Sequence, residues 1–373
     1  MDNITHSLLG AALAKTRLGR SSPIAPAALI IGANLPDLEN AVLVFLDQPA
    51  NMIHHRGVTH AVVGVVLLAP LFALLMHGIA RLLRLRNRSP GSLGALFVGV
   101  GLATASHPLL DWLNTYGLRP WLPFDDTRYC GDLVFIIDPW LWLLLGATVC
   151  LAGRRTRVGS IVLGCLALAL TAVVLVFDVI APRVLQIVWP VTVAVLVLGR
   201  GSGVGRRRPE AVVAAGVVAS CAYVGFLGWS GRTAWGMSRP VITTQLPEGE
   251  AIIAHTISPM PGRPLRWQIV AETQQAVYRH TFSILDEPGG PVRLDKRLDD
   301  PLVREVAASP EGHAWRVFAR HAVAAVARYH DHRSVLLMDA RYPMFPAREF
   351  SSFEIRVPEV SGGGPPPTSR RRE

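Results

Sequence analysis

The sequence is poor in cysteine and in charge, and each shortage excludes a class of protein. Its 373 residues include four cysteines, none after Cys221, and three of the four lie within apolar runs. This distribution excludes a disulfide framework and a zinc site built from cysteines. Charged residues make up 17% of the chain and hydrophobic residues 50%. In a chain longer than one domain, this composition indicates a membrane part joined to a soluble part.

Apolar runs that reach or approach the length of a membrane span fill the first 230 residues. A transmembrane helix needs about 20 apolar residues. The runs cover 24–46, 58–80, 92–113, 133–152, 159–178, 184–199 and 210–230, and a short helix is expected over about 3–16. No such run follows Trp229. We therefore expect a mainly α protein, a polytopic membrane helical bundle followed by a small α+β extramembrane domain.

The part after the apolar runs has the patterns of a small soluble domain. Alternating apolar residues predict strands over 251–258, 265–272, 277–285, 334–340 and 350–357, and an amphipathic helix is predicted over 313–329. The expected division is a metal-site membrane part over 1–152, further transmembrane helices over 153–232, an external α+β domain over 233–360 and a disordered tail over 361–373.

Basic residues mark the topology rather than a nucleic-acid surface, although the net charge is +10. Lysines and arginines crowd alternate connections, near 15–20, 81–88, 154–157 and 200–208. By the positive-inside rule these connections face the cytoplasm. The amino terminus has no basic region and predicts no cleaved signal peptide. We expect a multi-pass protein of the cell (inner) membrane whose region after 230 is external, and periplasmic in a cell with two membranes.

Two motifs place metal-ligand side chains among these apolar runs: His-His-Arg-Gly-Val-Thr-His at 54–60 and His-Pro-Leu-Leu-Asp at 107–111. Ionisable groups at bilayer depth are expensive and usually mark a site. On a helix His107 and Asp111 are four residues apart, so one cation can reach both side chains. The alternative is that His107 stabilises a packed interface and that Asp111 is a loop carboxylate.

The predicted topology brings the candidate ligands to one depth, near the outer face. Scattered structural groups would have little reason to converge in this way. Individually, however, they could be helix caps or turn residues. The candidate metal ligands are His6, Asp37, His55, His60, His107, Asp111 and Asp138. His54 is an alternative to His55, because usually only one of two adjacent histidines points inward.

Arg56 and Asp132 are the candidate catalytic residues beside these ligands. Arg56 follows His55 directly, so its guanidinium could pair bidentately with an anionic substrate. The loop 112–132 is rich in aromatic residues and prolines, and it could form an aromatic belt or the rim of a substrate site. Arg128 could face the same substrate or be a solvated surface residue.

The ordered motifs resemble the membrane-bound metal-dependent hydrolase family of the YdjM type. The resemblance rests on Met-Asp-Asn-Ile-Thr-His at 1–6, Pro-Asp at 36–37, His-Arg-Gly-Val-Thr-His at 55–60, His-Pro-Leu-Leu-Asp at 107–111 and Gly-Asp…Ile-Asp-Pro-Trp at 131–140. It covers about 1–150 and implies a zinc-dependent hydrolase of unsettled substrate. The ligand order is also similar to that of zinc phospholipases C and single-strand nucleases. Those enzymes continue with further histidines, whereas this chain offers only Asp132 and Asp138.

We therefore expect one or two metal ions rather than three. Mixed imidazole and carboxylate ligands suit Zn²⁺, with manganese or iron as alternatives. Zinc would acidify a bound water and polarise a phosphoryl oxygen. The expected function is hydrolysis of a phosphoester or lipid-linked substrate, such as a lipid phosphate, at the outer face of the bilayer. The alternatives are a structural metal site and a metal or ion transporter, although a transporter should place its polar residues near the midplane.

Overall fold

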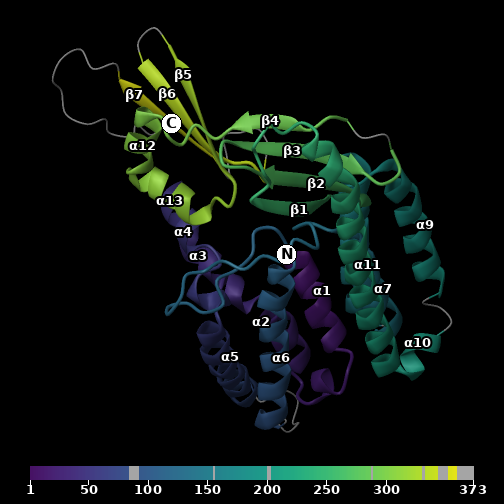
Figure 1. Cartoon of the computed structure of the whole chain (residues 1–373). Coiled ribbons are helices and arrows are strands. Elements are labelled where there is room, and N and C mark those ends of the chain that lie inside the picture. The colour runs from purple at the N-terminus through teal and green to yellow at the C-terminus, as the bar shows by residue number, and fades with distance from the viewer. Residues whose placement is uncertain are drawn as a thin grey trace. The chain divides into compact units, whose positions relative to one another are not determined.

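The protein, seen in a computed structural model, is described over residues 1–83, 92–153, 156–199, 203–286, 289–329, 332–342 and 352–358 (Figure 1). The chain forms two compact units. The membrane unit comprises 1–39, 56–231 and 258–265, and the sheet unit comprises 40–55, 232–257 and 266–373. The tail predicted over 361–373 lies outside the described residues.

Helices make up most of the membrane unit. They are α1 (Asn3–Leu13), η1 (Leu18–Arg20), α2 (Ala25–Gly32), η2 (Leu35–Glu39), η3 (Val58–His60), α5 (Val62–Leu82), α6 (Leu93–Trp112), α7 (Pro139–Ala152), α8 (Arg157–Val176), α9 (Arg183–Gly199), α10 (Val204–Arg207) and α11 (Pro209–Thr243), whose last residues belong to the sheet unit. Among the described residues, α5, α6, α8 and α11 are long and apolar enough to cross a membrane. The predicted helical membrane protein with a following α+β part is confirmed.

The apolar run over 24–46 is not one span, as its length suggested, but several short pieces. Helix α2 ends at Gly32, and the chain then forms η2 and the short α3 (Asn40–Leu43). Pro36 explains the break, because proline lacks an N–H group and disfavours helix at the preceding residue. The break places Asp37 and Glu39 in a short 3₁₀ turn beyond the end of α2 rather than inside a spanning helix.

Helix α1 is held closely between its neighbours, and this fixes the residues near its amino end. It contacts α2, α6 and α7. A Cβ added at Gly10 would lie 2.7 Å from the Leu29 carbonyl oxygen, so only glycine allows this approach of α1 to α2. Asp2 caps α1 by accepting hydrogen bonds from the backbone N–H groups of Ile4 and Thr5. The same carboxylate accepts a bond of 2.9 Å from Trp142 Nε1 of α7.

The sheet unit contains two small sheets with short helices. Its elements are α3, α4 (Gln48–His54), β1 (Ala254–Met260), β2 (Arg263–Glu272), β3 (Ala276–Ser283), β4 (Val292–Asp295), α12 (Pro301–Ala307), α13 (Pro310–Phe318), β5 (Ala322–Arg328), β6 (His332–Asp339) and β7 (Ser352–Pro358), with the end of β1 and the start of β2 in the membrane unit. One sheet has the order β1-β2-β3-β4 and the other β5-β6-β7. Helix α4 packs on α13, although the two are far apart in sequence.

The prediction of a helix over 313–329 was wrong for the second half of that range. Helix α13 ends at Phe318, and the alanine-rich segment after it is strand β5, which pairs antiparallel with β6. Val323 and Ala324 of this strand are buried. Alanine favours helix in isolation, but pairing with β6 and burial decide the conformation here. The predicted strands have counterparts in β1, β2, β3, β6 and β7, whereas β4 and α12 were missed.

A buried polar chain links the two sheets of this unit. Thr256 Oγ1 lies 2.7 Å from His321 Nε2, and His321 Nδ1 lies 2.7 Å from Glu272 Oε2. Lys296 Nζ lies 2.5 Å from the other oxygen of Glu272. Partial burial alone would raise the pKa of Glu272, but the bonds with His321 and Lys296 lower it below its ordinary value.

The sheet unit should therefore lose stability on acidification. Because the folded state lowers the pKa of Glu272, its contribution is complete above the unfolded value of about 4.3 and is lost as pH falls below it. We expect Glu272→Gln to lower the free energy of unfolding at neutral pH and to reduce its further fall on acidification. Glu305→Gln, on the exposed face of α12, should change neither. Amide exchange of β2 and β5, corrected for intrinsic rates, measures both effects. If Glu272→Gln lost as much stability on acidification as the wild type, the loss could not be assigned to Glu272.

Candidate metal centre

Five of the predicted ligands meet inside the membrane unit. His6 comes from α1, Asp37 from η2, His60 from η3, and His107 and Asp111 from the last turns of α6. The three histidines and Asp111 are almost completely buried. The potential ligand atoms form two groups, and within each group all atoms lie within 4.8 Å of one another. One group is His6, His107 and Asp111, and the other is Asp37, His60 and His107. The buried cluster could hold a metal ion.

Two carboxylates each lie close to the same two imidazoles. Asp37 Oδ1 lies 3.5 Å from His60 Nε2 and 3.6 Å from His107 Nε2. Asp111 Oδ2 lies 3.3 Å from His60 Nε2 and 3.4 Å from His107 Nε2. A tetrahedral zinc ion with bonds of about 2.0–2.2 Å requires ligand atoms about 3.3–3.6 Å apart. These four distances match the spacing of ligand atoms around one ion, and His107 is shared by both ligand groups.

Both imidazoles are oriented by bonds on their other ring nitrogen. His107 Nδ1 lies 2.7 Å from the Ala33 carbonyl oxygen, which can only accept, so this nitrogen carries the proton and Nε2 is available to a metal. His60 Nδ1 lies 3.1 Å from Thr59 Oγ1 and 3.5 Å from Glu39 Oε1. Thr59 Oγ1 in turn donates to Glu39 Oε2. Such outer carbonyl and carboxylate partners are typical of histidine ligands.

Asp111 faces two sets of partners with its two oxygens. Whereas Oδ2 lies against His60 and His107, Oδ1 is 3.5 Å from His6 Nε2 and contacts the α-amino group of Met1. The His6 ring stacks on the His107 ring, with centroids 3.7 Å apart. The two oxygens of Asp111 therefore differ: Oδ2 could join an ion held by the imidazoles, whereas Oδ1 is bonded to the α-amino group of Met1 and to Arg56 Nη2.

Arg56 forms a buried ion pair with Asp111. Its Nη2 lies 2.9 Å from Asp111 Oδ1, and Nη1 donates to Asn114 Oδ1 at 3.0 Å and to the Gly117 carbonyl at 3.1 Å. The side chain is buried, and its guanidinium lies 4.9 Å from the centre of the Tyr116 ring. Arg128 lies over the same ring at 5.0 Å. This geometry gives Arg56 a positioning contact with Asp111, and its pairing with a substrate anion stays a prediction.

A comparison with known protein families tests the resemblance seen in the sequence motifs. Residues 1–183 match the sequence model of the YdjM inner membrane protein family. The match confirms the resemblance seen in the motifs over residues 1–183, here called the YdjM region, and the family is known as membrane-bound metal-dependent hydrolases. No curated protein and no solved structure gives a significant match. All five clustered side chains lie within the YdjM region.

Three other predicted site residues lie outside both ligand groups. His55 caps the carboxyl end of α4 and belongs to the sheet unit. Asp138 is the N-cap of α7, where it accepts bonds from Trp140 N and Leu141 N, and it also accepts one of 2.9 Å from Tyr223 Oη. Asp132 stands between α6 and α7 with a φ of 55°. Among the described residues, the grouped ligand atoms of the YdjM region include none of the three.

Sequence reasoning missed two side chains that support the cluster. Glu39 accepts bonds from Thr59 Oγ1 and from the backbone N–H of Arg56, so it fixes the turn that carries His60. Asn3 Nδ2 donates to Asp37 Oδ2 at 2.8 Å. Burial would raise the pKa of Asp37, but His107 and His60 lower it well below its ordinary value. The signals were present in the sequence, since Glu39 follows Asp37 by two residues and Asn3 belongs to the opening YdjM motif.

Glu39→Gln should weaken metal binding without removing a ligand. The amide keeps the size of the side chain but loses the charge that orients His60, and losses of outer-shell partners typically weaken metal affinity by about 10- to 100-fold. Competition with a metal-sensitive dye during titration measures the affinity. Glu210→Gln is the matched control, because Glu210 pairs with Arg20 on an exposed surface of the same unit. Equal affinities for the two variants would exclude Glu39 from the metal centre.

Proposed function

We propose that the protein is an integral membrane metal-dependent hydrolase that acts on a phosphoester or lipid-linked substrate. One observation carries the proposal: Asp37 Oδ1 and Asp111 Oδ2, from segments distant in sequence, each lie 3.3–3.6 Å from the Nε2 atoms of His60 and His107. Ionisable side chains buried in a membrane protein are costly and usually mark a functional site. The mixed donors favour one zinc ion, and the group of His6, His107 and Asp111 would provide for a second.

A divalent ion bound there would supply an acidified water and a Lewis acid for a phosphoryl oxygen. The protein's own residues would fix the geometry. Ala33 and Glu39 orient the imidazoles, and Arg56 holds the carboxylate of Asp111. Arg128 and Arg56 add positive charge around Tyr116. Positive charge near the centre favours an anionic substrate such as a lipid phosphate.

The proposed location is the outer face of the cell membrane. The lysines and arginines of alternate connections orient the chain with the cluster toward the outside, by the positive-inside rule. The sheet unit would then be external, or periplasmic in a cell with two membranes. Phosphoester groups of lipids are accessible at that interface, which supports the proposed substrate class.

A structural metal is the second candidate, because the protein's own donors could fill the coordination of an ion held by Asp37, His60, His107 and Asp111. Structural zinc sites are closed, whereas catalytic ones keep an open position. The second ligand group, His6 with His107 and Asp111, favours catalysis, since two-metal sites are common in enzymes that cleave phosphoesters.

Chelation separates the two candidates. We expect the purified protein to contain zinc or a similar ion, and to hydrolyse at least one member of a panel of lipid phosphates. Removal of the ion should abolish turnover, and returning zinc or manganese should restore it. Arg56→Lys should lower turnover more than metal content, because a point charge loses the planar fork that holds Asp111. Stoichiometric metal with no chelator-sensitive hydrolysis of any ester would favour the structural site.

A further inference from the structure

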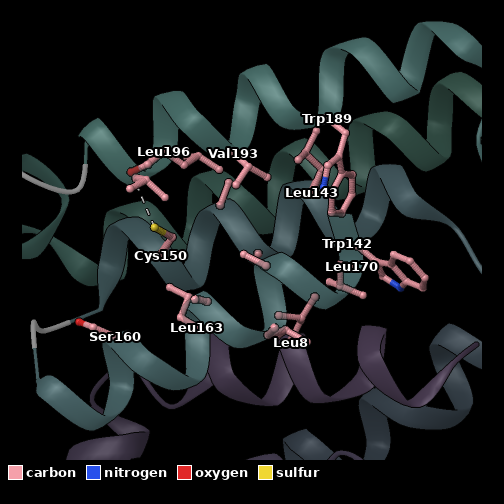
Figure 2. A pocket seen from close by; sticks show the side chains of 16 residues that line it. Leu8, Trp142, Leu143, Cys150, Ser160, Leu163, Leu170, Trp189, Val193 and Leu196 are labelled. Atoms are coloured by element: carbon pink, nitrogen blue, oxygen red, sulfur yellow. Dashed lines mark hydrogen bonds between the residues drawn. The ribbon is translucent and has the colours of Figure 1, made fainter. Parts of the chain in front are cut away.

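An apolar cavity of about 430 Å³ lies between α1, α7, α8 and α9 of the membrane unit (Figure 2). Its wall includes Leu8 of α1, Trp142 and Cys150 of α7, Leu163 of α8, and Trp189 and Val193 of α9. Trp142 and Trp189 gather toward one end, and Ser160 lies at the other (Figure 2). None of the metal-site residues lines it.

The cavity is elongated along the helices. On α7 the lining runs from Trp142 to Cys150, and on α8 from Ser160 to Leu170. At about 1.5 Å per residue these stretches extend about 12 and 15 Å. Gly146 and Gly164 lie on its walls, and a Cβ added at either would meet no atom within 4 Å. The shape and the small wall residues leave room for a narrow chain rather than for a compact ligand.

The chemistry of the wall favours a hydrocarbon occupant over water. The indole N–H groups of the two tryptophans are already bonded, that of Trp142 to Asp2 Oδ1 and that of Trp189 to Thr171 Oγ1. Apolar cavities without polar partners stay dry and bind apolar molecules, as an engineered cavity of roughly 150 Å³ binds benzene. Helix α8 is long and apolar enough to cross a membrane, so lipid chains would be the apolar molecules around this wall.

We propose that this cavity holds one acyl chain of a bilayer lipid, with the polar end of the lipid at the amino end of α1. Leu8 follows His6 by two residues, so the cavity and the metal cluster lie on opposite sides of α1 and share its amino end. There Asp2 bonds Trp142 at the cavity, and Met1 contacts Asp111 in the cluster. The proposal that a lipid chain occupies the cavity does not depend on the proposed function, whereas the assignment of this lipid as the substrate rests on it.

Photolabelling tests the occupancy without any turnover. The full-length protein is reconstituted into vesicles of phosphatidylethanolamine and phosphatidylglycerol, with a little phosphatidylglycerol that carries a diazirine in one acyl chain. We expect saturable labelling of the cavity-lining parts of α7, α8 and α9, competed by unlabelled phosphatidylglycerol. A diazirine near the chain carbonyl should label near Trp142, and one near the methyl end should label near Cys150.

Substitutions that fill the cavity can be compared with a matched substitution elsewhere in the membrane unit. Gly164→Leu and, separately, Gly146→Leu should reduce saturable labelling by about tenfold, because the new side chain overpacks the occupied volume. Gly78→Leu on α5 is the control, since a Cβ there also meets nothing within 4 Å. His107→Ala should label as the wild type does, so a failed hydrolase proposal leaves this result intact. Labelling that is not saturable, or equal in all variants, would overturn the cavity assignment, and a reversed diazirine pattern would overturn the orientation.

Discussion

Replacing His107 by alanine should reduce the metal content of the purified protein to about a tenth or less of the wild-type value. His107 belongs to both groups of potential ligand atoms, so its loss removes a donor from each. It also leaves Asp37 and Asp111 without an imidazole that stands 3.6 and 3.4 Å from them. His60→Ala removes one donor from one group and should lower metal content less. Elemental analysis after purification in a chelator-free buffer measures both.

His77→Ala is the control for this loss. His77 lies on α5, another membrane helix, and belongs to neither ligand group. Its replacement should leave metal content unchanged. The proposed zinc-dependent turnover should follow metal content across the three variants. Full metal occupancy in a protein lacking both His60 and His107 would refute the metal site and would remove the observation on which the hydrolase proposal rests.

The cluster was predictable from the sequence where covalent spacing or topology constrains it. His107 and Asp111 are one helical turn apart, which fixes their common face before any tertiary structure is known. Alternating basic connections placed His6, Asp37 and His60 at the same depth. His55 and Asp138 satisfied the same depth criterion, but depth alone does not fix lateral position. Asp138 caps α7, bonds Tyr223 and lies outside both ligand groups, so its role as a ligand stays a prediction.

Other features depend on contacts that no local pattern records. Glu39 orients His60 through a turn that forms only after Pro36 has ended the helix. The Ala322–Arg328 segment has a helical composition, and only its pairing with β6 makes it a strand. The long apolar segments α5, α6 and α8 were predicted well because the bilayer requires their backbone bonds to be made internally.

Asp111→Asn should destabilise the membrane unit even when no metal is bound. Asp111 is 1% exposed and Arg56 4%, and their side chains meet at 2.9 Å. Removing one partner of a buried ion pair leaves an uncompensated charge, at a cost of about 3–5 kcal/mol. Arg56 keeps its bonds to Asn114 and Gly117, which limits the loss. Thermal unfolding in detergent, with chelator present throughout, measures this effect apart from that of metal release.

A double-mutant cycle shows whether the pair itself is responsible. Combining Asp111→Asn with Arg56→Met removes both charges, so we expect the double variant to be more stable than the sum of the single losses by about 1–3 kcal/mol. Arg20→Met with Glu210→Gln is the control cycle, because that exposed pair should couple by less than about 1 kcal/mol. The recovered stability should not restore metal binding, since the carboxylate of Asp111 remains absent. Additive losses in the first cycle would mean that Arg56 does not compensate the charge of Asp111, and recovery of metal in the double variant would remove Asp111 from the ligand set.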